Sequence, residues 1–294
     1  MTSFSVTANA STDVLPADSN FADLSAAALA VLTTADPLTK VALTRRAAAG
    51  WFSGEIAELG RCVPPERPAR PERPELKLPR DMPKRGRGGS LANRLALLHA
   101  LAHIELNAID LAWDIVIRFP DQNMPRAFID DWVRVADDEA RHFTLLEQRL
   151  NSLDARYGDL PAHDGLWQSA TSTADDLAAR LAIVPMVLEA RGLDVTPETV
   201  RRLTNVGDHD SAAILQTIHD EEISHVAAGR RWFGYVCEIA GREPVSYWQE
   251  LVKQYFRGGL KRPFNITSRQ AAKFGPEFYE PIADPEPSSP PSRE

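Results

Sequence analysis

Apolar residues recur three and four positions apart along most of this chain, the spacing that places them on one face of an α-helix. Capping residues, prolines and glycines divide the pattern into segments. Helices are predicted over residues 21–32, 37–59, 90–120, 125–153, 174–191, 197–205, 208–240, 244–257 and 268–274. Because no run of alternating β-branched residues indicates a sheet, the predicted fold class is all-α.

Interruptions of this pattern define the expected domains. Residues 64–89 are so rich in proline, arginine and glycine that an extended connector, wrapped around the body, is expected. Gly192 is expected to cap the helix over 174–191, before a short helix that starts at Pro197. The predicted parts are a disordered N-terminus (1–20), N-terminal helices with the connector (21–89), a four-helix bundle (90–240), a C-terminal helical extension (241–282) and a disordered tail (283–294).

The composition changes this picture little. The 294 residues are 44% hydrophobic and 25% charged, and the net charge of -8 disfavours nucleic acid as a partner. Cys62 and Cys237 lack the spacing of a zinc site or a redox dithiol, so free thiols in a reducing compartment are expected. The sequence shows no secretory signal and no run of roughly 18 apolar residues. We therefore expect a cytoplasmic protein without a membrane partner.

Two segments of the form Glu-x-x-His carry the candidate chemistry. Glu139 and His142 lie in DDEARH, and Glu222 and His225 lie in DEEISH. Residues three apart project from the same helix face, so each pair can bind one cation through a carboxylate and an imidazole. One such pair alone is weak evidence, because Glu and His are common on solvated helix faces.

The spacing of the pairs strengthens the prediction. Glu105 precedes Glu139 by 34 residues and Glu189 precedes Glu222 by 33, and both preceding glutamates lie in apolar helix. Two helical hairpins with one long crossover would bring each Glu opposite one Glu-x-x-His, as in a ferritin-like di-iron carboxylate bundle. Oxygen and imidazole ligands without thiolates suit two iron ions, and equally manganese. The predicted metal ligands are Glu105, Glu139, His142, Glu189, Glu222 and His225.

The polar residues near the two motifs are expected to have surface or structural roles rather than to bind metal. Acidic residues beside the two motifs are expected to be solvated surface charges: Asp137, Asp138, Asp220 and Glu221. His99 and His103 project away from Glu105 around the helix, which favours packing or outer-layer roles. Three residues are candidates for outer partners of the ligands or for ordinary structural roles: Asp110, Arg141 and Arg191.

The segments HALAHIELNAIDLAWD, DDEARHF, LEARGLDVTP and DEEISHV resemble a ferritin-like family of bacterial proteins catalogued as a domain of unknown function, and the resemblance covers about residues 22–282. It implies an all-helical ferritin-like core with a dinuclear metal centre whose ligands fall on the six residues named above. A more distant resemblance is to di-iron monooxygenases, including the tRNA hydroxylase branch, in which this ligand pattern activates oxygen. The acidic balance here offers no obvious RNA-binding surface.

Three functions follow as hypotheses. The first is a di-iron oxidoreductase or oxygenase that activates dioxygen or peroxide for an unidentified small-molecule or RNA substrate, in a pocket beside Glu105 and Glu189. Without a flavin, nicotinamide or iron–sulfur motif, it would need an external electron donor. The alternatives are a ferroxidase or iron-handling protein, and a non-catalytic helical interaction module with a structural metal. The N-terminal helices and connector could form a lid or a homodimer surface.

Overall fold

The computed structural model describes residues 21–83, 89–120, 122 and 124–285. This part of the chain is helical, and its β-bridges, Leu76 with Ala162 and Leu260 with Ala283, are isolated. The all-α fold class is therefore confirmed for the described residues. The predicted disorder over residues 1–20 lies outside them, and so does the predicted tail (283–294) from residue 286 onward. In the described part of that tail, Asp284 N donates to Leu260 O.

Most of the helices follow the apolar periodicity, but the short helices over residues 165–172 and 276–279 were not predicted. In chain order they are α1 (Leu24–Thr33), α2 (Pro37–Ser53), α3 (Leu91–Arg118), α4 (Arg126–Asn151), α5 (Gly165–Ser172), α6 (Leu177–Ile183), the π-helical η2 (Val184–Glu189), α7 (Ala190–Asn205), α8 (His209–Ala240), α9 (Pro244–Tyr255), α10 (Ile266–Ala271) and α11 (Pro276–Tyr279). Short 3-10 segments, η1 (Pro79–Asp81) and η3 (Glu280–Ile282), complete the set.

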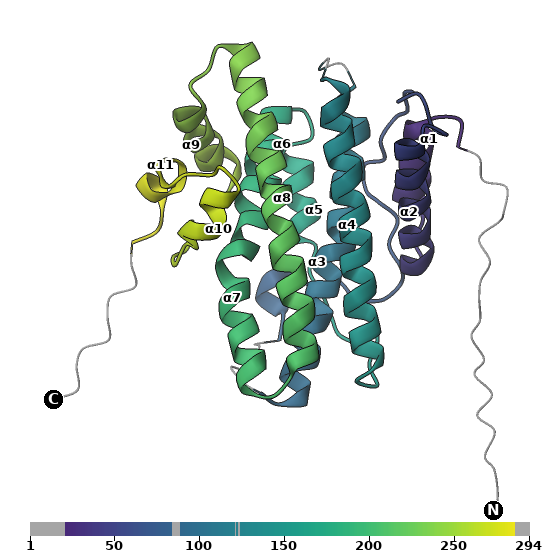
Figure 1. Ribbon diagram of the computed structural model, residues 1–294, viewed down its shortest axis with the longest axis vertical. Coiled ribbons are helices and arrows are strands. Elements are labelled where there is room, and N and C mark those ends of the chain that lie inside the picture. Colours follow the sequence, from purple (N-terminus) through teal and green to yellow (C-terminus); the bar gives the residue numbers. More distant parts are fainter. Residues whose placement is uncertain (1–20, 84–88, 121, 123, 286–294) are drawn as a thin grey trace, which may run out of the picture.

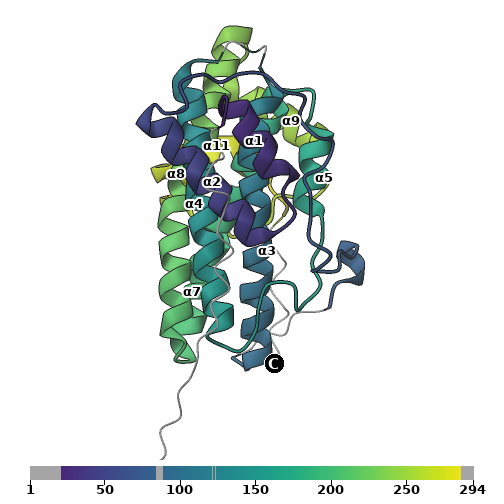
Figure 2. The same cartoon turned by 90° about the vertical axis from the view of Figure 1, so that its right-hand side faces the viewer.

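Helices α3, α4, α7 and α8 lie side by side along the long axis of the molecule (Figures 1 and 2). Helix α3 packs on α4 and α7 packs on α8, as expected for two helical hairpins, and contacts between α4 and α8 join the two pairs. Helices α1 and α2 cover the outside of α3 and α4. Helices α9, α10 and α11 pack on the side formed by α6, α7 and α8.

Helix α3 lies at the centre of this arrangement. It is long and apolar enough to cross a membrane by length and composition, with a mean hydropathy of 1.3, but 67% of that window is buried inside the protein. Neighbours α1, α4 and α5 cover it on several sides, which explains why it is apolar almost all round. Its composition is that of a core helix.

Two predicted boundaries were wrong. The third long helix does not end at Gly192: α6, η2 and α7 follow one another without a break, and Pro197 lies inside α7. The local breakers are overridden because Leu193 and Leu203 of α7 are buried in the core. In addition, α2 ends at Ser53 rather than near residue 59, because Gly54 adopts a left-handed conformation with φ of 83° and caps it.

The proline-rich connector is extended over its described part and lies against the body, as predicted. Ala69 N donates to Leu32 O at the end of α1, and Lys77 N donates to Ala162 O in the long connection between α4 and α5. Arg70 forms an ion pair with Asp110 of α3. The connector therefore ties the N-terminal helices to α3 and to the crossover.

Candidate metal centre

Carboxylates and an imidazole from three helices meet in the interior. Glu105 of α3, Glu139 and His142 of α4, and Glu222 of α8 each offer a ligating atom, and these atoms lie within 4.8 Å of one another. All four residues are buried. Such a group could hold a metal ion, since each of these side chains is a common metal ligand.

The two histidines face the carboxylates with the same ring nitrogen. His142 Nδ1 lies 3.5 Å from Glu105 Oε2 and 3.4 Å from Glu139 Oε2. His225 Nδ1 lies 3.1 Å from Glu139 Oε1 and 3.6 Å from Glu222 Oε1. The ring centroids are 5.9 Å apart. The structure thus brings five of the six predicted ligands together, with Glu139 between the two imidazoles.

Glu189, the sixth predicted ligand, lies outside the four-residue group and ends the π-helix η2. The residue is half-buried as a whole, but its Oε2 atom is buried and has no hydrogen-bond partner. Burial and the negative charge of Glu222 raise the pKa of Glu189 well above its usual value. Glu189 is carried by η2, which packs on α8, the helix of Glu222 and His225.

Two buried carboxylate oxygens of the predicted ligands have no hydrogen-bond partner among the described residues: Glu189 Oε2 and Glu222 Oε2. Glu139 Oε1 and His225 Nδ1 form an ion pair at 3.1 Å but no hydrogen bond. Buried polar atoms are almost always hydrogen-bonded, so each orphan needs an explanation. Cations bound by these side chains would supply the missing partners. The residues present therefore fit a metal centre.

Without a cation, the site must hold protons. Burial and the neighbouring Glu139 raise the pKa of Glu105 well above its usual value. Burial acts to lower the pKa of His142, but the hydrogen bonds and charges of Glu105 and Glu139 outweigh it and raise that pKa to about 11. Four buried carboxyl groups cannot all ionise together unless positive charge accompanies them.

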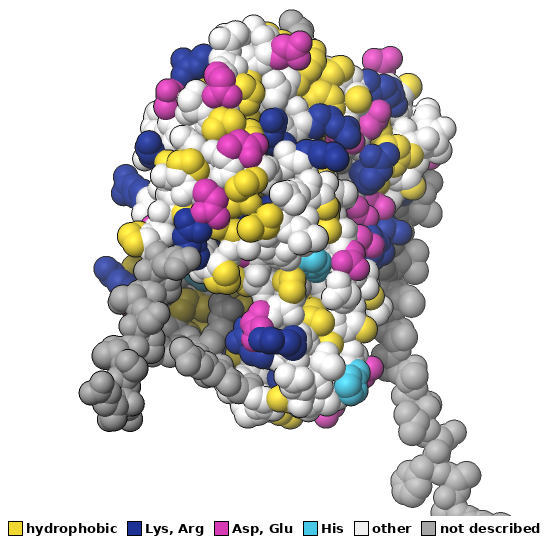
Figure 3. Space-filling view, turned by 60° about the vertical axis from the view of Figure 1, so that its left-hand side comes forward, with side chains coloured by type: hydrophobic (Ala, Val, Ile, Leu, Met, Phe, Trp, Pro, Cys, Tyr) yellow, Lys and Arg dark blue, Asp and Glu magenta, His cyan; other side chains and the backbone are white. Residues whose placement is uncertain are grey.

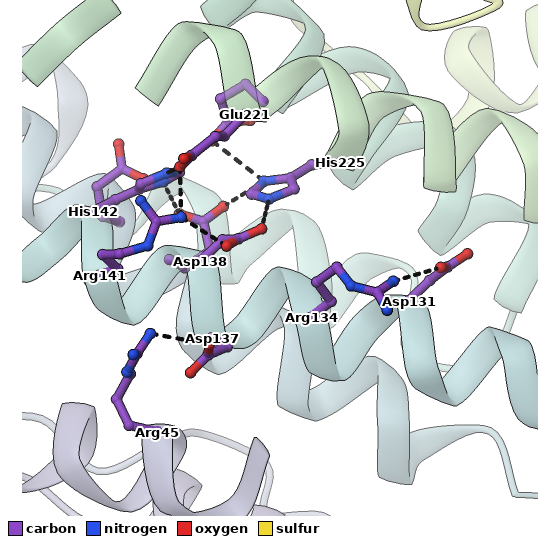
Figure 4. Close-up of polar contacts among 12 residues, drawn as sticks. Arg45, Asp131, Arg134, Asp137, Asp138, Arg141, His142, Glu221 and His225 are labelled. Atoms are coloured by element: carbon purple, nitrogen blue, oxygen red, sulfur yellow. Dashed lines mark hydrogen bonds and ion pairs between the residues drawn. The ribbon is translucent and has the colours of Figure 1, made fainter. Parts of the chain in front are cut away.

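An outer layer of charged residues holds the far side of both imidazoles (Figure 4). Glu221 Oε2 lies 2.6 Å from His142 Nε2, and Asp138 Oδ2 lies 3.3 Å from His225 Nε2. Arg141 donates to both carboxylates, at 2.8 Å to Asp138 and 2.7 Å to Glu221. Each carboxylate can accept a hydrogen bond from an Nε2–H group, which leaves Nδ1 facing the cluster.

The expectation that Asp138 and Glu221 are plain surface charges was therefore wrong. Each immediately precedes the glutamate of one Glu-x-x-His motif and contacts the histidine of the other motif. That shared position in both motifs was the available sequence signal. The same expectation fits Asp137, which pairs with Arg45 on the surface, and the exposed Asp220.

The remaining candidates divide clearly. Arg141 is an outer partner of the site, whereas Asp110 pairs with Lys40 and Arg70. Arg191 donates to the carbonyl oxygens of residues 261 and 263, not to the cluster. His99 accepts a hydrogen bond from Gly158 N, and His103 bonds the Tyr157 hydroxyl. Both histidines pack against the crossover, which agrees with the expected packing role.

Comparison with known proteins places the chain. A family model described as "Protein of unknown function (DUF455)" matches residues 33–280. The chain belongs to this family. A relative from Haemophilus influenzae, named "Uncharacterized protein", is 39% identical over 209 residues, which cover 69% of this chain and 72% of the relative. No solved structure matches the chain. The family match includes all six predicted ligands.

Replacing Glu221 by Gln is expected to weaken metal binding about 10- to 100-fold, because it removes the charge that holds the His142 ring. The change keeps the size of the side chain and lies outside the predicted ligand set. Competition against a chelator of known affinity measures the change. Asp137→Asn is the matched control, because it also removes one negative charge but alters only the pair with Arg45. Equal metal affinities of the two variants would contradict the role of Glu221 in holding the His142 ring.

The π-helix η2 packs tightly on α8 at a glycine. A Cβ atom added at Gly229 would lie 2.4 Å from two ring carbons of Pro185, so only glycine allows this approach. π-helical turns are rare and are frequent at functional sites. Here the turn ends in Glu189, which links the packing of Gly229 to the position of a predicted ligand.

Gly229→Ala is therefore expected to destabilise the protein by about 1–3 kcal/mol, because the rigid proline ring must move. The control is Gly192→Ala in α7, where an added Cβ meets no atom within 4 Å. That change is expected to stabilise the protein by up to about 1 kcal/mol through the higher helix propensity of alanine. Urea denaturation measures both, and equal effects would show that the Pro185 contact does not matter.

The described residues also form a cavity of about 200 Å³ between α4 and α8, lined in part by His225 and Val135. A pocket was expected beside Glu105 and Glu189, and neither residue lines this cavity. It opens beside the outer side of the second Glu-x-x-His motif instead. Its rim carries Arg134 and Arg231.

Proposed function

We propose that this protein is a ferritin-like dinuclear metal oxidoreductase or oxygenase that uses two iron ions to activate dioxygen or peroxide. The six ligands would be Glu105, Glu139, His142, Glu189, Glu222 and His225. The observation that supports the proposal is the buried group of ligating side chains from α3, α4 and α8, together with buried carboxylate oxygens of Glu189 and Glu222 that lack hydrogen-bond partners. A purely structural core would be expected to satisfy such atoms with hydrogen bonds.

The donor set supports iron, with manganese as the second choice, because it combines carboxylates and imidazoles without thiolates. When bound, two irons can supply electrons to dioxygen. The protein's own contribution is to hold the ligands in place. Asp138, Glu221 and Arg141 fix the imidazole rings from outside, and buried side chains such as Trp132 and Phe143 exclude water.

Electrons must come from another protein or a small reductant, since the chain shows no motif for a redox cofactor of its own. The proposed substrate is a small molecule or RNA. On the face formed by α7, α8 and the C-terminal helices, basic side chains lie next to acidic ones (Figure 3). That mixture favours a small molecule over a nucleic acid backbone.

Metal binding is expected to release protons and to weaken as pH falls. The pKa of His142, raised to about 11, keeps this imidazole protonated at neutral pH in the metal-free site, and the pKa values of Glu105 and Glu189 are raised as well; ligating atoms must lose protons to bind a metal. Calorimetry of metal binding in buffers of different ionisation enthalpy measures the released protons. Identical apparent enthalpies in all buffers would contradict this expectation.

The reaction itself is tested by mixing the anaerobic, Fe(II)-loaded protein with dioxygen. We expect both irons of each chain to oxidise much faster than free Fe(II), followed by re-reduction with an artificial donor. Continued uptake of Fe(II) far beyond about two per chain would identify iron handling instead. Iron that stays bound but does not react with dioxygen or peroxide would contradict the proposal and favour a structural metal.

A further inference from the structure

The two Glu-x-x-His motifs are not equivalent in what surrounds them. In the first motif His142 follows Arg141, and in the second His225 follows Ser224. The three residues after each histidine also differ in size. Phe143, Thr144 and Leu145 follow His142 in α4, whereas the smaller Val226, Ala227 and Ala228 follow His225 in α8. Smaller side chains therefore flank the second histidine.

The cavity between α4 and α8 lies where these smaller side chains occur. Ser224, Ala227 and Ala228 line it from α8, and Val135 lines it from α4. His225 also lines it, and this imidazole is only 1% exposed. At about 200 Å³ the cavity is smaller than the roughly 300–1,000 Å³ typical of pockets for drug-sized ligands, so it suits a small molecule.

The rim of the cavity carries an excess of positive charge. Arg134 and Arg231 both donate to Asp131, at 3.4 Å and 2.8 Å. Trp232 Nε1 donates to the same carboxylate at 2.9 Å, which fixes its position. Each guanidinium has five N–H donors, and its bond to Asp131 uses one of them. Two cations thus converge on one anion, and donors remain for a second anion.

Arg134 is held in place from a further side. Its guanidinium lies over the ring of Phe52 at the end of α2, 5.3 Å from the ring centroid. Figure 4 shows Arg134 and Asp131 on α4, farther along that helix than Asp138, which contacts His225 of α8. The arginine is therefore oriented by two contacts, while 58% of its side chain is exposed to solvent. A planar guanidinium held in this way matches the geometry of a carboxylate.

We infer that this cavity binds a small organic carboxylate, with its charged end at Arg134 and Arg231 and its apolar part on Val135 and Ala228. Ser224 adds a hydroxyl group at the wall. A ligand in this place lies next to the imidazole of His225. The binding of the carboxylate does not depend on the proposed function. Its role as the substrate does depend on it.

Calorimetric titration of the full chain with propionate tests the inference. Propionamide, which has the same shape without the charge, and inorganic phosphate are titrated alongside. Propionate is expected to bind, with propionamide and phosphate at least about tenfold weaker, because a charge-assisted hydrogen bond to a carboxylate is lost or misplaced. Equal binding of propionamide, or binding of phosphate without propionate, would overturn the carboxylate assignment.

Two variants probe the residues. Arg134→Gln/Arg231→Gln removes the charge, and Ala227→Leu fills the cavity while it keeps both arginines. Each is expected to weaken propionate binding at least about tenfold. Arg242→Gln, which alters an exposed arginine paired with Glu250, is the control and should leave binding unchanged. Unchanged binding in the first two variants would overturn the inference.

Metal content is measured on the same samples. All of these variants keep the six proposed metal ligands, so they are expected to bind as much metal as the unaltered chain. Absence of metal from every sample, with propionate binding intact, would refute the proposed function alone. Absence of propionate binding from a metal-loaded chain would refute the carboxylate site alone.

Discussion

Replacing Glu139 and Glu222 together by alanine is expected to reduce metal uptake from about two ions per chain to almost none. Glu139 is within 3.4 Å of both imidazole Nδ1 atoms, and Glu222 is within 4.0 Å of both. Their loss leaves no carboxylate between the two rings from α4 or α8. Elemental analysis of the purified variant after metal loading measures the effect.

A matched control exists on the same helices. Asp137→Ala/Asp220→Ala removes two acidic residues, each two positions before one of the proposed ligands, and makes the same change in net charge. Because Asp137 and Asp220 lie on the surface, this variant is expected to keep its metal. Equal metal content of the two double variants would mean that the uptake reflects overall charge rather than the buried cluster.

Asp110→Asn is expected to cost about 3–5 kcal/mol of folding free energy, because it leaves a buried cation without its partner. Asp110 is fully buried and pairs with Lys40 of α2 and Arg70 of the connector. Burial is the main cause that lowers the pKa of Lys40, and the ion pair with Asp110 opposes it. Without Asp110, Lys40 must either lose its proton or remain charged and unpaired.

Urea denaturation measures this loss, with Asp137→Asn as the control. The Arg45–Asp137 pair also joins α2 to α4, but it is partly exposed and is expected to contribute less than about 1 kcal/mol. A similar small change for Asp110→Asn would contradict the view that the N-terminal helices and connector are fixed to α3 by this ion pair. A large loss would identify it as the main polar link between these parts.

Much of the fold could be predicted from periodicity, because the long helices carry their own boundaries in caps and apolar spacing. Helices α3, α4 and α8 begin and end within two residues of the predicted positions. The third long helix was misjudged, since Gly192 and Pro197 read locally as breakers. Packing of Leu193 and Leu203 in the core decides the outcome there, and that information is not local.

The part of the candidate site that could be predicted is the part encoded by a repeated spacing in the sequence. The spacing from Glu105 to Glu139 and from Glu189 to Glu222 placed the ligands on facing helices. The cross-helix bonds of Asp138 and Glu221 and the cavity beside His225 depend on how two helices are rotated against each other. A single sequence does not specify that rotation. The same holds for Asp110, whose ion-pair partners are Lys40 and Arg70.

The central claim is that two metal ions lie among these six side chains. Anomalous X-ray diffraction from crystals of the iron-loaded protein, recorded on both sides of the iron edge, locates the ions directly. Two peaks about 3.5–4 Å apart, surrounded by Glu105, Glu139, His142, Glu189, Glu222 and His225, are the predicted result. A single peak, or iron found only at the protein surface, would contradict the dinuclear centre.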